Sequence, residues 1–383
     1  MKARVLALYL PQFHPIPEND EWWGPGFTEW TNVAQAKPMF RGHVQPKIPA
    51  DLGFYDLRLA ETREQQAQLA RKAGIEGFCY YHYWFGNGRQ LLERPFREVV
   101  ESGKPDFPFC LCWANHSWSN KTWQRKSALQ DNPMFIEQLY PGEQDDIEHF
   151  MSLLPAFKDP RYVTIDGKPV FVLWEPRDHP HVKEWINTWR RLATENGLPG
   201  LYLIGMTHST LAFKVNEDGQ RVRTMPNLES SAEVFQWVLD QGFDAVNSYG
   251  KRRGEMKKDG KYVNLLKTAL RRIGVPVGQR FDYPKTVKHF FAPEDKWENV
   301  FPTILPQWDR TPRRAAWDGI YVGATPDAFE QHVRQAVDVV KDKDAEHRVL
   351  FLKSWNEWGE GNYVEPDLQF GHGWLQAIYN AIK

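Results

Sequence analysis

Short runs of apolar, β-branched and aromatic residues recur along the whole chain, and polar segments with helical periodicity lie between them. The runs are mostly continuous rather than alternating, which is the pattern of parallel strands that are buried on both faces. We therefore predict eight strands, at residues 5–10, 75–81, 108–113, 170–174, 201–206, 243–247, 301–305 and 349–352.

Several of the intervening segments carry helix start and stop signals. Residues 57–72 have apolar or small residues at helical spacing and stop at Gly74, and residues 182–195 end before an Asn-Gly pair. A third helix is predicted to begin at Thr325, a cap residue that is followed by Pro326 in the first turn. The chain thus alternates between predicted strands and helices.

Eight βα units in one chain predict an α/β fold, a (β/α)₈ TIM barrel that forms one catalytic domain over residues 1–383. The alternative is an open doubly wound sheet. Such a sheet would have a Gly-rich phosphate loop after its first strand, where this chain has Pro-Gln-Phe-His at 11–14. Long segments at 15–56, 114–141 and 251–300 are predicted to begin on the face where the strands end, which is where barrel active sites lie.

Composition narrows the classes of function. The chain has 48 Lys and Arg against 49 Asp and Glu, and this balance argues against a general nucleic-acid binder. Hydrophobic residues make up 42% of the chain, but no run of about 18 apolar residues could span a membrane. Its 17 tryptophans exceed what a core needs, and such an excess is common in carbohydrate-active proteins.

The spacing of cysteine and histidine does not indicate a metal site. Cys79, Cys110 and Cys112 lie in apolar runs and are predicted to be reduced core thiols. The His-x-His sequence at 179–181 contains a proline and lies in a loop, so we expect neither a metal nor another cofactor. The N-terminal residues lead directly into the first predicted strand without a small-residue cleavage site, and we therefore expect a cytoplasmic protein.

The segment with the most chemical content directly follows the last predicted strand. Residues 354–361 read Ser-Trp-Asn-Glu-Trp-Gly-Glu-Gly and include Glu357 and Glu360. Carboxylates can move protons, and the faces of neighbouring indoles can stack on pyranose rings, so this pattern favours a sugar-cleaving site. The alternative is a strand end with solvated glutamates and core tryptophans.

Polar and aromatic residues gather at the carboxyl ends of the predicted strands, as expected for a barrel active site with a saccharide-sized pocket. Each of them could instead be structural, and a lone histidine is more often satisfied in the core. The candidates for substrate binding are Tyr9, His14, Tyr83, Trp84, Trp113, Asn115, His116, Trp174, Glu175, His208, Tyr249, Trp308, Asp309 and Asn356. We expect at least two of Trp84, Trp113, Trp174 and Trp308 to be exposed in one cleft as stacking platforms.

Residues 251–272 are strongly basic. A solvated helix or loop face is the default interpretation of such a charge run. The alternative is a peripheral contact with anionic membrane lipid or a lipid-linked glycan.

Six segments, at 8–19, 26–33, 77–85, 112–115, 306–314 and 354–366, together resemble the WbsX-type branch of a superfamily that includes the endo-α-mannosidases of glycoside hydrolase family 99. The segments at 306–314 and 354–366 resemble the P-G-Y/W-D-x-T and N-E-W-x-E-G sequences of the mannosidases themselves. The resemblance extends over essentially the whole chain. It implies a TIM barrel with Glu357 and Glu360 at the end of the eighth strand.

By this resemblance, Glu357 would act as a base on the substrate 2-hydroxyl, and Glu360 would be the general acid/base at the glycosidic oxygen. We expect Glu360 to lie against an apolar wall, with its pKa raised by desolvation, and Glu357 to remain ionised beside an amide or hydroxyl. Asp309 and Arg313 are expected to hold ring hydroxyls.

The implied activity is that of a retaining, endo-type glycoside hydrolase or transglycosylase acting on a bacterial polysaccharide, either mannan-like or an O-antigen glycan. Two alternatives stay open. One is a glycosyltransferase of O-antigen or capsule assembly, because WbsX-type proteins commonly carry that label, although neither a D-x-D sequence at a strand end nor a Gly-rich phosphate loop is present. The other is a barrel that only binds glycans.

Overall fold

The computed structural model describes residues 1–119, 134–207, 230–257, 263, 266, 270, 280–313 and 319–383, together with the backbone of 213–215 and 221–223. Eight parallel strands form a closed barrel in which neighbours in the chain are also neighbours in the sheet. β1 pairs with both β2 and β16, which closes the ring. The strands are β1 (Arg4–Tyr9), β2 (Gly77–Trp84), β4 (Phe109–Trp113), β8 (Lys168–Leu173), β9 (Tyr202–Thr207), β12 (Ala245–Ser248), β14 (Val300–Ile304) and β16 (Val349–Leu352).

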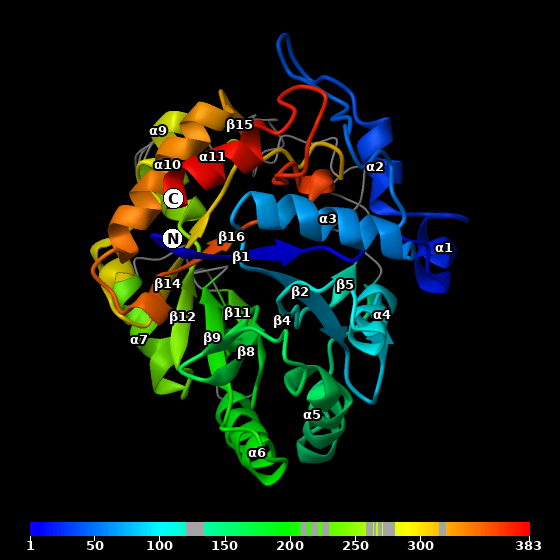
Figure 1. Ribbon diagram of the computed structural model, residues 1–383, viewed down its shortest axis with the longest axis vertical. Coiled ribbons are helices and arrows are strands. Elements are labelled where there is room, and N and C mark those ends of the chain that lie inside the picture. Colours follow the sequence, from blue (N-terminus) through cyan, green and yellow to red (C-terminus); the bar gives the residue numbers. More distant parts are fainter. Residues whose placement is uncertain are drawn as a thin grey trace.

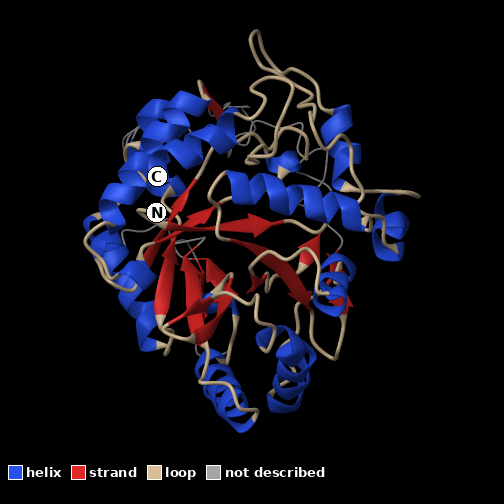
Figure 2. Cartoon of the chain, in the orientation of Figure 1, coloured by secondary structure: helices blue, strands red, loops and turns tan. Residues whose placement is uncertain are grey.

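All eight predicted strands and the predicted barrel are therefore confirmed. Figures 1 and 2 show the strands in the interior and the helices around them. Every residue of β2, β4, β9, β12, β14 and β16 is buried, as expected for parallel strands that are covered on both faces.

The described α-helices are α1 (Pro17–Trp23), α2 (Glu29–Gln35), α3 (Ala60–Lys72), α4 (Arg94–Ser102), α5 (Glu143–Phe157), α6 (Val182–Glu195), α7 (Ser231–Asp240), α9 (Tyr283–Val287), α10 (Pro326–Val340) and α11 (Gly373–Ile382). α6 has the predicted bounds, and α3 begins a few residues later than predicted. The Thr325 side chain accepts a hydrogen bond from the amide of Ala328 at 3.2 Å, so the predicted cap of α10 is confirmed. Among the helices that the structure describes, none has the length and apolar character to cross a bilayer.

Several shorter elements lie in the loops between the barrel strands and the helices. They are the strands β3 (Gln90–Leu91), β5 (Trp118–Ser119), β6 (Met134–Ile136), β7 (Thr164–Ile165), β10 (Phe213–Val215), β11 (Arg221–Arg223), β13 (Arg280–Asp282) and β15 (Ile320–Val322), and the 3-10 turns η2 (Pro176–Asp178), η3 (Pro293–Lys296), η4 (Ala345–His347) and η5 (Trp358–Glu360). β13 and β15 pair with each other beside the loop that follows β14.

The loop after β16 is held to the rest of the barrel by buried hydrogen bonds. Asn356 accepts a bond from the amide of Leu10 at 2.7 Å and donates one to its carbonyl at 3.0 Å, so this loop is joined to the end of β1. Farther along, the buried Glu365 accepts bonds from Tyr55 Oη at 2.9 Å and Trp358 Nε1 at 2.6 Å, and Gln66 Nε2 donates to its other oxygen at 2.7 Å. These contacts fix the backbone on both sides of Glu357 and Glu360.

Burial raises the pKa of Glu365 to about 7, although its hydrogen-bond donors oppose this shift. The folded protein therefore binds a proton at Glu365 more tightly than the unfolded chain, where a glutamate titrates near about 4.3. Its contribution to stability is fully present at low pH and is lost as the pH rises from about 4.3 through about 7.

Glu365→Gln should remove this dependence, because the amide is uncharged and of similar shape. Between pH 5 and pH 8, we expect the wild type to lose up to about 3 kcal/mol of unfolding free energy through ionisation of Glu365. The variant should not show this loss. Urea denaturation at the two pH values measures it. An unchanged difference between variant and wild type would contradict the buried, neutral carboxyl.

Candidate active site

Glu357 and Glu360 converge on one cation beyond the end of β16. Glu357 directly precedes the turn η5 and Glu360 ends it, and the two residues are only 5% and 8% exposed. Oε1 of Glu357 lies 3.1 Å from Nη1 of Arg313, and Oε1 of Glu360 lies 2.8 Å from the same nitrogen. Because they share one nitrogen, the two oxygens are no more than about 6 Å apart.

A third carboxylate binds the other edge of the same guanidinium. Glu29, the first residue of α2, accepts hydrogen bonds from Arg313 Nε at 2.9 Å and Nη2 at 3.1 Å in a bidentate arrangement. Burial alone would lower the pKa of Arg313, but the three carboxylates raise it well above its ordinary value. Burial raises the pKa of Glu29, while Arg313 opposes that shift. Arg313 is thus a fixed cation at the centre of the site.

Lys353 provides a second cation from the end of β16. Its Nζ lies 3.2 Å from Glu357 Oε2 and 4.0 Å from Glu360 Oε2. The same nitrogen lies 3.2 Å from the hydroxyl of Tyr81 and 4.8 Å from the centre of the Trp174 ring. Lys353 therefore joins the glutamates to the inner face of β2 and to the end of β8.

Glu360 contacts one more cation, since Arg310 Nε lies 3.1 Å from its Oε1. The predicted apolar wall beside Glu360 is therefore wrong, because two guanidinium groups surround this carboxylate. Nearby opposite charges favour the ionised form of a carboxyl group. The side chain of Arg310 is 23% exposed, against 6% for Arg313 and 3% for Lys353, so Arg310 is the most accessible of these three cations.

Asp309 supports the loop after β14. One carboxylate oxygen accepts from Gln45 Nε2 at 2.6 Å and lies 2.7 Å from His43 Nε2, and the other accepts from the hydroxyl of Thr311 at 2.7 Å. Burial alone would raise the pKa of Asp309, but the hydrogen bonds from His43 and Thr311 outweigh it and lower the pKa. The amide of Asp309 donates to the carbonyl of Glu360 at 2.8 Å, which joins the two loops. Asp309 is thus saturated by protein groups, and its predicted contact with ring hydroxyls is not supported.

Three tyrosines surround the pair. Burial, followed by the charge of Glu357, raises the pKa of Tyr81 and Tyr83. Burial, followed by the charge of Glu360, raises the pKa of Tyr249. These tyrosines remain protonated at neutral pH and can donate hydrogen bonds within the site.

Three predicted binding residues lie on the outer side of the barrel wall, and for these the prediction is wrong. The Tyr9 hydroxyl donates to Gln66 of α3 at 2.6 Å. Trp84 donates to Asp145 of α5 at 2.9 Å and stacks on a histidine of that helix. Trp113 packs against α5 and α6, with its centroid 5.9 Å from that of Trp185. All three side chains fill the layer between strands and helices.

Three other candidates have structural partners. Asn356 binds Leu10, as described above, and Asn115 binds both the amide and the carbonyl of Glu175 at 2.9 Å. His14 is buried with its Nδ1 2.9 Å from the carbonyl of Pro11, and burial lowers its pKa to about 4. These residues shape the loops, and their predicted contact with substrate is not supported.

The prediction of two exposed tryptophan platforms is also wrong. Trp84, Trp113 and Trp308 are 3%, 2% and 5% exposed, and Lys251 Nζ lies 4.3 Å from the centre of the Trp308 ring. Trp174 is half-buried, and so are Glu175 and His116. Trp174 is therefore the one predicted platform that keeps substantial exposure beside the glutamates.

Two predictions fall partly or wholly outside the described residues. His208 lies outside them, and so does much of the basic segment 251–272. In its described part, Lys251 pairs with Glu255 at 2.8 Å and Arg253 with Asp295 at 3.3 Å. These two charges are engaged within the protein.

The sequence interpretation missed Glu29, Arg310 and Lys353. Two of them had a visible signal. Glu29 is an acid inside the conspicuous segment 26–33, and Lys353 directly follows an apolar strand, four residues before Glu357. A charged residue at the end of a buried barrel strand is a candidate for the active site.

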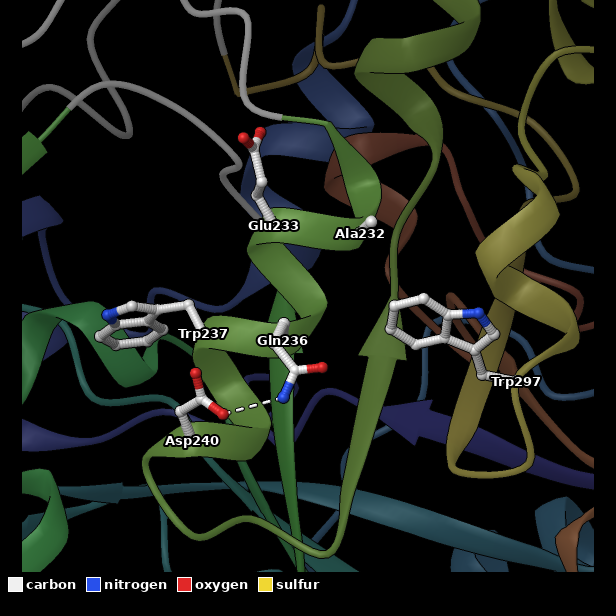
Figure 3. A pocket seen from close by; sticks show the side chains of 6 residues that line it. All are labelled: Ala232, Glu233, Gln236, Trp237, Asp240 and Trp297. Carbon is white, nitrogen blue, oxygen red and sulfur yellow. Dashed lines mark hydrogen bonds between the residues drawn. The ribbon is translucent and has the colours of Figure 1, made fainter.

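Two other features lie away from this site. Glu298, Asp344 and His347 could hold a cation, but they precede β14 and β16 and so lie at the opposite end of the barrel. His347 is already bonded to Glu298 at 2.7 Å and to Asp166 at 3.1 Å. A shallow surface pocket of about 490 Å³ is lined by α7 and Trp297, and it contains none of the residues around Glu357 (Figure 3).

A model of the family described as "Glycosyltransferase WbsX" matches residues 5–378. The chain belongs to this family. The protein WxcX of Xanthomonas campestris pv. campestris (strain B100), described as uncharacterized, is 33% identical over 385 residues, which cover 100% of this chain and 50% of WxcX. The chain thus spans about half the length of the curated relatives it matches.

Solved structures of similar fold include a glycoside hydrolase-like protein, with a TM-score of 0.56 and 15% identity over 100% of this chain and 94% of that one. A GH99 endo-alpha-mannosidase from Bacteroides thetaiotaomicron, in complex with bis-tris-propane, gives a TM-score of 0.55 and 12% identity over 100% and 96%. At these identities the likeness shows the fold. The resemblance predicted from the sequence is confirmed for both the family and the barrel.

Gly359 allows Glu29 to approach the loop after β16. A Cβ atom at this position would collide with the Glu29 carboxylate, which Arg313 holds in place. We expect Gly359→Ala to lower the unfolding free energy by about 3–5 kcal/mol, the typical cost of breaking a buried ion pair.

Urea denaturation measures this change. Gly88→Ala is the matched control, because Gly88 has a φ of +72° and open space around its Cβ position. The control should lose only about 1–2 kcal/mol, the cost of left-handed backbone for alanine. Equal losses in both variants would show that Glu29 does not constrain position 359.

Proposed function

We propose that this barrel is a retaining glycoside hydrolase or transglycosylase that acts within a bacterial polysaccharide, with Glu357 and Glu360 as its catalytic pair. The observation that carries the proposal is the convergence of both carboxylates on Nη1 of Arg313, at 3.1 and 2.8 Å, at the carboxyl end of the barrel. The contacting oxygens are no more than about 6 Å apart, so both acids can reach one sugar ring. Retention is proposed from the family resemblance.

The proposed roles follow the family resemblance. Glu357 accepts the proton of the sugar 2-hydroxyl, and the resulting oxyanion attacks the anomeric carbon to give a 1,2-anhydro sugar. Glu360 gives a proton to the leaving oxygen as the glycosidic bond breaks. Water or a sugar hydroxyl then attacks the anomeric carbon and opens its bond to O2; Glu360 takes the proton of the attacking group, and Glu357 returns its proton to O2. Lys353, 3.2 Å from Glu357, stabilises the ionised carboxylate before it takes the proton.

The acid role of Glu360 requires a change in its ion pairs. A carboxylate between Arg310 and Arg313 has no proton to give. Arg310 is the more exposed of the two, so a substrate that enters the site can displace it from Glu360. Loss of this cation favours protonation of Glu360 next to the leaving oxygen.

A mannan-like or O-antigen glycan is the proposed substrate. The mannosidase fold supports mannose, and the polar and aromatic groups around the pair, including the half-buried Trp174, suit a saccharide. The proposed catalytic domain is the whole of residues 1–383.

The second candidate is a glycosyltransferase, which the description of the family model favours. A transferase would bind a sugar nucleotide or a lipid-linked sugar. Calorimetry with a panel of nucleotide sugars, beside hydrolysis assays on aryl glycosides and mannan oligosaccharides, separates the two. Cleavage that retains the anomeric configuration, as detected by NMR, supports the hydrolase. Nucleotide-sugar binding without cleavage supports the transferase, and glycan binding alone supports a barrel that only binds.

Glu357→Gln and Glu360→Gln should each lower kcat at least about 100-fold with little change in KM, because the amide keeps the shape and removes proton transfer. Substrates with activated aryl leaving groups need little acid assistance. On these substrates, Glu360→Gln should recover its first step and Glu357→Gln should not. Steady-state and burst kinetics measure both effects.

The matched control is Glu330→Gln on α10, where the carboxylate pairs only with groups outside the site, including Arg334 at 2.7 Å. This variant should keep wild-type kinetics. Equal, mild losses in both active-site variants on every substrate would mean that Glu357 and Glu360 are structural, and the hydrolase proposal would fail.

A further inference from the structure

Glu29 is a buried carboxylate that is fully enclosed and reaches the catalytic pair without being part of it. It is 0% exposed and comes from α2, more than three hundred residues before Glu357 in the chain. Its two oxygens bind Nε and Nη2 of Arg313, which leaves Nη1 of the same guanidinium to face both catalytic carboxylates. The planar fork of an arginine fixes these directions relative to each other.

We propose that Glu29 is a positioning residue: it holds Arg313 in the orientation in which one guanidinium nitrogen bridges the two catalytic glutamates. This role rests on the proposed function, because it requires Glu357 and Glu360 to catalyse glycoside cleavage or transfer. Glu29 does not touch the reacting atoms. It acts through Arg313 by setting where the bridging nitrogen lies and how much positive charge the pair experiences.

The surrounding packing leaves Glu29 little freedom. Gly359, between the two glutamates, lies so close to the Glu29 carboxylate that a side chain there would overlap it. α2 also contacts the turn η5 through Trp30, whose ring centroid is 5.4 Å from that of Trp358. The amide of Glu29 donates to the carbonyl of Gln12 at 3.0 Å, which ties the start of α2 to the loop after β1. These contacts hold Glu29 in a fixed position relative to the barrel and to the two glutamates.

Among the described residues, the charges of the site balance one another, so the loss of one carboxylate leaves an excess of positive charge. The titratable groups that face Glu357 and Glu360 are Glu29 from α2, Tyr81 and Tyr83 from β2, Tyr249 after β12, Arg310 and Arg313 after β14, and Lys353 after β16. Three cations oppose three carboxylates. Without the charge of Glu29, the three cations would act on two carboxylates.

Glu29→Gln tests the proposal. The amide nitrogen of Gln would face a guanidinium donor, so one of the two parallel bonds is lost together with the charge. We expect kcat on the cleaved glycoside to fall about 10- to 100-fold with a much smaller change in KM. Both limbs of the pH–rate profile should move to lower pH by roughly one pH unit, because a charge that opposes ionisation of the pair is gone.

Asp159→Asn is the matched control. Asp159 binds Arg161 in the same bidentate manner, at 2.9 and 2.6 Å, before β8 at the other end of the barrel. This control should change stability but leave both limbs of the pH profile in place. Wild-type kcat and limb positions in Glu29→Gln would overturn the proposal.

Arg313→Lys is a second variant, which also serves if Glu29→Gln does not fold. Lysine keeps the charge but lacks the fork, so it cannot hold Glu29 and both glutamates at once. We expect the same large fall in kcat, and wild-type kinetics would overturn the proposal.

A crystal structure of Glu29→Gln separates this proposal from the proposed function. If the wild type cleaves no glycoside, the hydrolase proposal fails, but the geometry is still decisive. Loss of the contact between Arg313 Nη1 and at least one of the two glutamates supports the positioning role. Retention of both contacts would overturn it.

Discussion

The buried guanidinium of Arg313 organises this site, because it alone among the described residues joins all three acids. Glu29 comes from the loop after the first barrel strand, and Glu357 and Glu360 from the loop after the last. A buried charge is stable only when it is paired and hydrogen-bonded, so the positions of these side chains depend on one another. A shift of any one of them leaves a charge without its full set of partners.

The closure of the barrel brings these partners together. β1 pairs with β16 along Arg4–Ala7 and Val349–Leu352, so the loops that follow the first and last strands leave the barrel side by side. Asn356 reinforces this neighbourhood through its two bonds to Leu10. Gly359 then permits the close approach of α2 to the loop after β16. The fold and the charge network therefore stabilise each other.

The ion pairs also set the charge around the two glutamates. Each glutamate contacts two or more cations. Nearby positive charge favours the ionised form of a carboxyl group. The proposed function therefore requires Glu360 to gain a proton when substrate binds. Arg310 is the most exposed of these three cations, whereas Arg313 and Lys353 are buried, so Arg310 is the one that the proposed mechanism releases from Glu360.

The sequence by itself determined the barrel and singled out the segment that carries Glu357 and Glu360, because both depend on local patterns. Continuous apolar runs mark strands buried on both faces, and the two acids lie three residues apart in one segment. The same continuity hides which way each side chain points: all eight residues of β2 are buried, so no alternation separates Tyr81 and Tyr83, beside the pair, from Trp84, under α5. The tertiary structure alone decided this, and it alone paired Glu29 with Arg313 across 284 positions of the chain, since charge complementarity at that distance leaves no local pattern.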